Sequence, residues 1–158
     1  MTGQWFTPSF DGFDTSNTNN FGGRPDQIAG ASLYSKTQTI NNWFNSAAFK
    51  VPGCPDATPV CASPADIGRF GNAAPLQLAG LGTENLDFTF MKDFHLTESK
   101  TLRFEAVFAN LFNHPAFSNP ASDISAISTV GVITSNTGNY LQGSSASRVI
   151  NFALDLKF

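Results

Sequence analysis

Charged residues are scarce in this sequence. Asp, Glu, Lys and Arg make up 13% of its 158 residues, whereas soluble domains average about a quarter. Much of the chain is therefore expected to meet something other than water. The net charge is −3 and the Lys and Arg residues form no cluster. Because phosphate contacts need a basic stripe, we expect no nucleic-acid partner.

Long apolar runs are also missing. No segment approaches the roughly 18 consecutive apolar residues of a transmembrane helix. The opening segment Met1–Phe6 has neither the basic start nor the apolar core of a signal peptide. The chain expressed as written is therefore expected to be cytoplasmic.

Phenylalanine, by contrast, is abundant, with 16 residues against two each of Tyr and Trp. Three segments, 86–96, 102–112 and 148–158, carry apolar residues mainly at even positions and polar or small ones mainly at odd positions. Side chains of a strand alternate between two faces, so each segment predicts a strand with one apolar face. The even row comprises Leu86, Phe88, Phe90, Phe94, Leu96, Leu102, Phe104, Ala106, Phe108, Phe112, Ile150, Phe152, Leu154, Leu156 and Phe158, and is interrupted by Lys92 and Asn110.

The connections between these segments favour a membrane barrel. Each segment has about the 9–11 residues that a tilted strand needs to cross a bilayer. A tight polar turn at 97–100 joins the first two, and a long stretch rich in Ser, Asn and Gly, residues 113–145, joins the last two. Short turns on one side and long loops on the other are typical of outer-membrane barrels. The predicted fold is all-β, with antiparallel amphipathic strands that form the last three or four strands of a large barrel.

Residues 1–85 are predicted to be mostly extracellular-type loop, with one strand at their start, because turn-forming residues punctuate them. On the odd face of the three strands, charged residues predict a cross-strand ion-pair ladder facing a wet lumen. These residues are Asp87, Arg103, Glu105, Asp155 and Lys157.

The two cysteines, Cys54 and Cys61, are close enough in sequence to close a small loop. We expect a disulfide if the chain is exported to an oxidising compartment. The other interpretation is half of a zinc site, but the sequence has neither a second Cys pair nor a nearby His to complete it.

Several motifs together resemble the C-terminal end of Oar-like TonB-dependent outer-membrane transporters. They are Trp43–Phe49, Gly68–Asn72, Gly80–Gly82 with Asn85–Asp87, Lys92–Phe94, Thr97–Glu98, Phe104–Phe117 and the final Phe158. The resemblance implies an outer-membrane location and a large barrel whose remaining strands, with membrane lipid, are the partners of this chain. Such a segment would not transport alone, and a free-standing chain would need self-association to cover its strand edges.

A second hypothesis is enzymatic. In type and size, the chain is similar to a short metagenome-derived N-acyl-homoserine lactone lactonase. The sequence lacks the usual esterase and zinc-lactonase signatures, which leaves calcium-assisted hydrolysis. Asp11, Asp14, Asn17 and Asn19 offer oxygen ligands for Ca²⁺.

In this hypothesis His114 and Asp123 would be the base and its orienting partner, activating water on a lactone. The structural interpretation of His114 is a strand-end residue at the membrane interface. The barrel interpretation requires no cofactor.

Overall fold

The structure is a computed structural model, and it describes residues 3–65, 67–137 and 147–158. Its regular elements are antiparallel strands apart from one 3-10 turn, η1 (Ser46–Ala48), which confirms the all-β prediction. The described part contains no helix with the length and apolar character to cross a bilayer. Two compact units are distinguished: a strand unit of residues 82–117 and 136–158, and a loop unit of residues 2–81 and 118–135.

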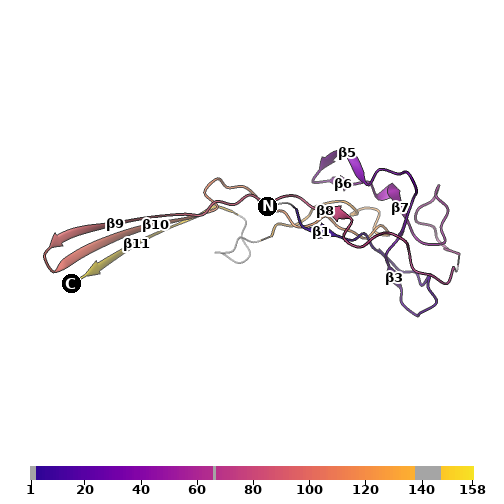
Figure 1. Cartoon of the computed structure of the whole chain (residues 1–158), viewed down its shortest axis with the longest axis horizontal. Coiled ribbons are helices and arrows are strands. Elements are labelled where there is room, and N and C mark those ends of the chain that lie inside the picture. The colour runs from indigo at the N-terminus through magenta and orange to yellow at the C-terminus, as the bar shows by residue number, and fades with distance from the viewer. Residues whose placement is uncertain (1–2, 66, 138–146) are drawn as a thin grey trace. The chain divides into compact units, whose positions relative to one another are not determined.

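The strand unit is a three-stranded antiparallel sheet in the order β11-β10-β9 (Figure 1). Its strands are β9 (Phe88–Thr97), β10 (Lys100–Ala109) and β11 (Val149–Lys157). The register places even residues opposite even residues in both pairings: Ala106, for example, lies opposite Phe90 on β9 and Phe152 on β11. The three apolar rows therefore share one face of the sheet, as the alternation predicted.

The strand boundaries differ from the predicted ones at identifiable residues. β10 starts at Lys100 and ends at Ala109, because Asn110 takes a left-handed conformation (φ 52°) that a strand does not allow. Near the turn the register shifts by one residue, since Lys100 pairs with Thr97 but Thr101 pairs with His95. The extra residue on β9 forms a bulge, a feature common at the rims of barrels.

The loop unit contains short strand pairs rather than one sheet. Its strands are β1 (Trp5–Phe6), β2 (Phe10–Asp11), β3 (Gly22–Gly23), β4 (Asp26–Gln27), β5 (Tyr34–Thr39), β6 (Asn42–Phe44), β7 (Phe49–Lys50) and β8 (Leu78–Ala79). They pair as β1-β8, β2-β3, β4-β7 and β5-β6. The sequence predicted one strand near the start, where β1 lies. Most of the others have two or three residues, too few to show a period of two, and the six-residue β5 reads Tyr-Ser-Lys-Thr-Gln-Thr, without an apolar alternation.

A common apolar core holds these pairs together. Phe6 meets Phe44 edge-on with ring centroids 5.8 Å apart, and Phe44 meets Phe49 in the same manner at 6.1 Å. Leu78 and Ile124 complete the same buried cluster from distant parts of the chain. Full burial of each such side chain stabilises by about 1.5–3 kcal/mol. The loop unit therefore has a core of its own.

The predicted disulfide is present. Cys54 and Cys61 are bonded across a separation of seven residues. The bond closes a small loop against the core, in which Cys54 is buried and Cys61 packs at the edge.

Candidate functional site

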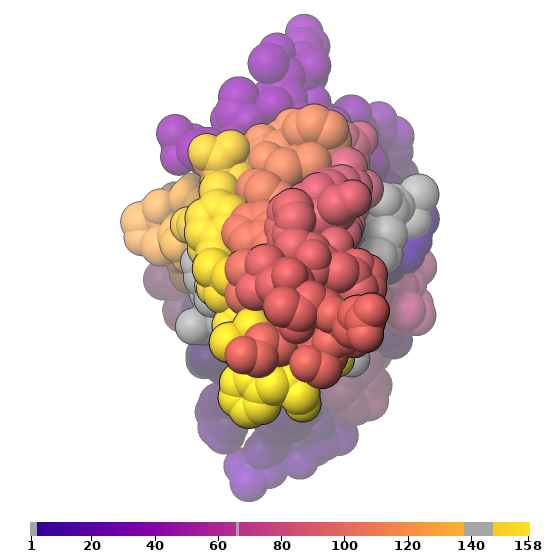
Figure 2. Space-filling view, turned by 90° about the vertical axis from the view of Figure 1, so that its left-hand side faces the viewer, coloured from indigo at the N-terminus to yellow at the C-terminus, as the bar shows by residue number. Residues whose placement is uncertain are grey.

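The even face of the sheet, defined by the even-numbered residues of β9, β10 and β11, exposes its apolar side chains. Phe152 is 67% exposed and Leu154 is 64% exposed, and Phe88, Phe90 and Phe94 are about half exposed. The rings form rows across the strands, with Phe104 stacked on Phe152 at 6.0 Å. Figure 2 views the turn end of this sheet, where β10 lies between β11 and β9. An apolar patch of this extent needs a non-aqueous neighbour.

Two lysines belong to the even face: Lys100 at the turn end of β10, and Lys92, which interrupts the apolar row. Lys92 lies near the middle of β9, in register with Phe104. A lysine on the lipid face of a barrel costs about 2–4 kcal/mol at the bilayer midplane. Its long stem lowers that cost by allowing the amine to reach toward more polar surroundings.

The odd face, defined by the odd-numbered residues of the same strands, carries an ion pair. Arg103 Nε donates to Asp93 Oδ1 at 2.7 Å, and Arg103 Nη2 donates to Asp93 Oδ2 at 2.9 Å. Asp155 occupies the position opposite Arg103 on the other neighbouring strand. Arg103 thus has an acidic residue in register on both sides. The ladder prediction named Arg103 and Asp155 but not Asp93, which is the residue that forms the ion pair. Both members of the pair are more than a third exposed, which suits a face that meets water.

The outer edges of the sheet have no strand partners within the described residues. Both β9 and β11 pair with β10, which is the middle strand. Each outer edge therefore presents a row of backbone N–H and C=O groups that a neighbouring strand would satisfy.

A turn after β10 forms hydrogen bonds at the end of the sheet opposite the β9–β10 turn, where β10 ends and β9 and β11 begin. The buried Asn110 donates its backbone N–H to Asp87 Oδ1 at 2.8 Å, just before β9. Its side chain bonds the backbone N–H and C=O of His114 at 2.9 Å each. Asn113 Oδ1 accepts the backbone N–H of Arg148, just before β11, at 3.0 Å. The Asn-Leu-Phe-Asn-His sequence thus joins the end of β10 to the residues just before β9 and β11.

The predicted catalytic residues belong to different units, His114 to the strand unit and Asp123 to the loop unit. His114 Nδ1 lies 3.7 Å from Glu84 Oε2, at a cavity of about 330 Å³ that both residues line. Asp123 Oδ1 accepts the backbone N–H of Ser125 at 2.8 Å. Neither unit brings the pair together, and their catalytic role stays a prediction without support. His114 lies beyond the end of β10, and its location at the membrane interface stays a prediction.

Of the four predicted calcium ligands, Asp11 ends β2, and Asp14, Asn17 and Asn19 lie in the turn region that follows it. Asp14 acts here as a cap, because its carboxylate accepts the backbone N–H groups of Ser16, Thr18 and Asn19. Partial desolvation raises the pKa of Asp14, but these hydrogen bonds outweigh it and the net pKa is lowered.

The other three ligands take local roles. Asp11 accepts the backbone N–H of Gly12, while Asn17 and Asn19 adopt left-handed conformations. Across the described ranges, no three His, Cys, Asp or Glu side chains converge as a metal cluster. Calcium binding by Asp11, Asp14, Asn17 and Asn19 stays a prediction.

The Gly68–Asn72 motif has a structural role that the sequence did not reveal. Arg69 forms a bidentate ion pair with Asp26, which is 4% exposed, with N–O distances of 2.8 and 2.7 Å. The backbone N–H of Asn72 donates to the same carboxylate at 3.0 Å. Gly71 packs so closely on the backbone of Arg24 and Pro25 that a Cβ would clash. The motif therefore clamps the chain onto β4.

This clamp lowers the pKa of the Asp26 carboxyl. Desolvation raises that pKa, but the hydrogen bonds from Arg69 and from the Asn72 backbone, with the charges of Arg69 and Lys50, outweigh it. The same pairing raises the pKa of Arg69.

Comparison with known protein families identifies the kind of protein to which this sheet belongs. The sequence model described as "Outer membrane beta barrel domain" matches residues 1–150. The chain belongs to this outer-membrane β-barrel family. Membership gives the chain an outer-membrane location, and it accounts for the exposed even face, because barrel strands point apolar side chains at lipid. No match was found among curated proteins or among solved structures.

Proposed function

We propose that this chain forms the C-terminal strands of a TonB-dependent outer-membrane transporter, together with an ordered loop unit. One observation carries the proposal: the three-stranded sheet exposes large apolar side chains on the even face of β9 and β11, and both of its outer edges lack strand partners in the described part of the chain. Lipid would cover the face, and further strands of the same barrel would pair with the edges. Three strands enclose no pore, so the chain is not transport-competent alone.

The dimensions of the sheet support a membrane-crossing role. β9 and β10 have ten residues each and β11 has nine, within the roughly 9–11 that cross a bilayer at a tilt. The turn between β9 and β10 is tight, whereas residues 110–148 separate β10 from β11. The connection between β10 and β11 would then lie on the extracellular side, where outer-membrane barrels carry their long loops.

The TonB-dependent class is supported by the motifs that resemble Oar-like transporters. Two of them have a structural role: Gly68–Asn72 clamps the chain onto β4, and Asn110 and Asn113, within Phe104–Phe117, join the end of β10 to the residues just before β9 and β11.

The membrane role is tested by spin-label scanning along β10 in outer membranes. Single cysteines replace Phe104, Glu105, Ala106 and Val107 in turn; the native cysteines are bonded to each other and stay unreactive. We expect high collision rates with oxygen and low rates with a water-soluble nickel complex at the even positions, and the reverse at the odd ones. Equal accessibility at Phe104 and Glu105 would refute a lipid-facing even face.

The TonB class is tested separately. The protein that carries this chain is tagged after Gly30, where the backbone is in a turn and open space surrounds the residue. Cells are cross-linked with formaldehyde, and outer-membrane complexes are purified and probed for TonB. Co-purification of TonB is expected, with loss after deletion of the TonB-interacting segment of the same protein. A clean absence of TonB in properly inserted protein would overturn the transporter class and leave the barrel assignment unchanged.

A further inference from the structure

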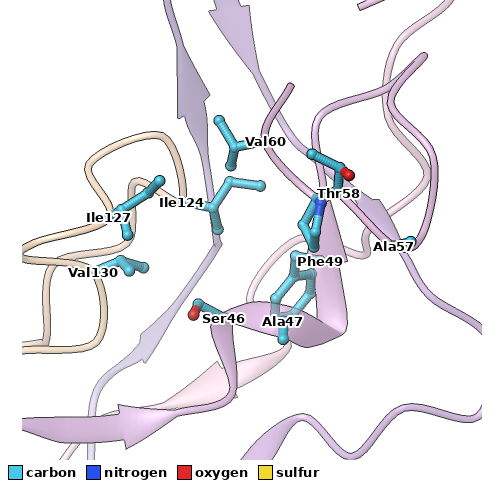
Figure 3. A pocket seen from close by; sticks show the side chains of 10 residues that line it. Ser46, Ala47, Phe49, Ala57, Thr58, Val60, Ile124, Ile127 and Val130 are labelled. Atoms are coloured by element: carbon cyan, nitrogen blue, oxygen red, sulfur yellow. The ribbon is translucent and has the colours of Figure 1, made fainter. Parts of the chain in front are cut away.

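The loop unit contains an apolar pocket of about 300 Å³ (Figure 3). Three segments that are distant in the sequence supply its walls. Ser46, Ala47 and Phe49 come from η1 and β7, residues 57–60 come from the disulfide loop, and Ile124, Ile127 and Val130 come from the connection between β10 and β11. All of these residues belong to one compact unit, so the pocket does not depend on how the two units are arranged.

The chemistry of the lining is uniform. None of the ten lining residues is charged, and the side-chain hydroxyls of Ser46 and Thr58 are its polar groups. Phe49 and Ile124 belong to the buried core, whereas Ile127 is 74% exposed. A charged ligand would lose its hydration here without gaining a counter-charge, which costs several kcal/mol. The pocket therefore favours an uncharged, apolar occupant.

The wall formed by the disulfide loop is held in place before any ligand arrives. The bond between Cys54 and Cys61 closes the loop. The backbone N–H of Val51 donates to Pro59 C=O at 2.7 Å, and Lys50 forms an ion pair with Asp56. A preformed wall reduces the entropy lost on binding, so modest contact area can give useful affinity.

We propose that this pocket binds a small, uncharged aliphatic molecule. A cavity of about 300 Å³ lies at the lower end of the size range of small-molecule pockets, so its occupant must be small. Ile127 would lie over the ligand, and Phe49 and Ile124 would line its inner end. The hydroxyls of Ser46 and Thr58 offer hydrogen bonds to one polar end of the ligand. The inference stands apart from the proposed transport function because it rests on the loop unit alone.

The test is site-resolved photolabelling of the full chain in amphipol, which leaves no free detergent to compete. The probe is a ten-carbon alkanol that carries a diazirine, and mass spectrometry maps the labelled residues. We expect labels within residues 46–49, 57–60 and 124–130 that excess 1-decanol removes. Each methylene taken from the competitor should weaken competition about fourfold, which corresponds to about 0.8 kcal/mol per buried CH₂. Labels on β9–β11 report the even face and serve as an internal reference.

Two variants with matched controls make the result specific. Ile127→Asp should reduce pocket labelling at least tenfold, whereas Ile40→Asp, on an exposed isoleucine outside the pocket, should leave it unchanged. Ala47→Phe should fill the cavity and abolish labelling, whereas Ala62→Phe, exposed and outside the lining, should not. Hydrogen exchange checks that each variant keeps the loop-unit core.

Three results would overturn the proposal. The first is pocket labelling that excess 1-decanol does not reduce. The second is equal labelling in Ile127→Asp and in the unaltered chain. The third is an unlabelled pocket that cross-links to a co-purifying protein, which would identify a protein occupant in place of a small molecule. None of these results affects the spin-label test of the strands.

Discussion

The two units use the same residue type for opposite purposes. In the loop unit Phe49 is fully buried, and it packs with Phe44 in a core that water does not reach. In the strand unit Phe152 is 67% exposed, on a face where phenylalanine recurs on all three strands. The difference shows that the loop unit contains its own apolar environment, whereas the strand unit requires one from outside. A membrane supplies that environment, and the family assignment agrees.

The sharpest way to break this comparison is a charge on the even face. Phe152→Arg should remove about 2–4 kcal/mol of stability in lipid, because Arg is costly near the bilayer midplane. Asn151→Arg, one residue away on the odd face, should be nearly neutral. Urea unfolding in lipid vesicles measures both variants. Equal losses in the two variants would contradict the separation of the faces.

Removal of the disulfide should act on the other unit. The double variant Cys54→Ser with Cys61→Ser should destabilise the loop unit by about 2–3 kcal/mol by the loop-closure estimate. Hydrogen exchange should become faster in residues 46–65 and stay unchanged in β9–β11. Faster exchange in the strands of the double variant would show that the two units are not energetically separate.

Acid should weaken the loop unit through Asp26. Its folded-state pKa lies below the ordinary value of 3.8. The ionised carboxylate therefore contributes its full stabilisation above about pH 4 and loses it as the pH falls through the folded-state pKa. Asp26→Asn should remove about 1–3 kcal/mol at pH 7, typical of hydrogen bonds to a charged group.

Asp26→Asn should also reduce the loss of stability that the unaltered chain shows below about pH 4. The measurement is hydrogen exchange of the Gly68–Asn72 clamp between pH 2 and pH 7. Asp56→Asn is the control, since Asp56 is largely exposed. An unchanged acid limb in Asp26→Asn would assign the acid sensitivity to other groups.

Substitution of Lys92 should give the smallest change in stability, and it should stabilise the protein where the other variants destabilise it. Lys92→Leu restores the apolar row on β9 and should stabilise the strand unit in lipid by about 1–2 kcal/mol, less than the full midplane cost because the native stem can reach outward. The measurement is the urea midpoint in vesicles, with Lys100→Leu at the turn as control. A lower midpoint for Lys92→Leu would mean that the amine has a stabilising partner in the membrane.

The strand unit was predictable from sequence because each of its strands is determined by residues that are close together in the chain. A period of two over nine or ten residues fixes which side chains share a face, and a two-residue turn fixes the partner of β9. The bulge near Thr101 and the early end of β10 at Asn110 were not predictable, since both depend on single backbone conformations. The disulfide was predictable from the short separation of its cysteines.

The loop unit was largely unpredictable because it is held together by contacts between residues that are distant in the sequence. Phe6, Phe44, Leu78 and Ile124 meet in one core from four distant parts of the chain. Asp26 and Arg69 are 43 residues apart, and neither shows its partner in the sequence. The apolar pocket likewise needs three separate segments. For Asp14 the oxygen-rich composition predicted a metal ligand, but such residues also cap turns, and composition does not distinguish the two roles.

The unequal connections of the sheet set the order in which it forms. β9 and β10 are joined by a two-residue turn, so their pairing closes almost no chain and can start early. β11 reaches β10 only after the chain from 110 to 148 is closed, an entropy loss of about 3 kcal/mol for roughly forty flexible residues. If residues 118–135 fold into the loop unit first, fewer unfolded residues remain in the connection, and the entropy lost on pairing β11 with β10 is smaller. The pairing of the last strand therefore depends on a segment that is not in the sheet.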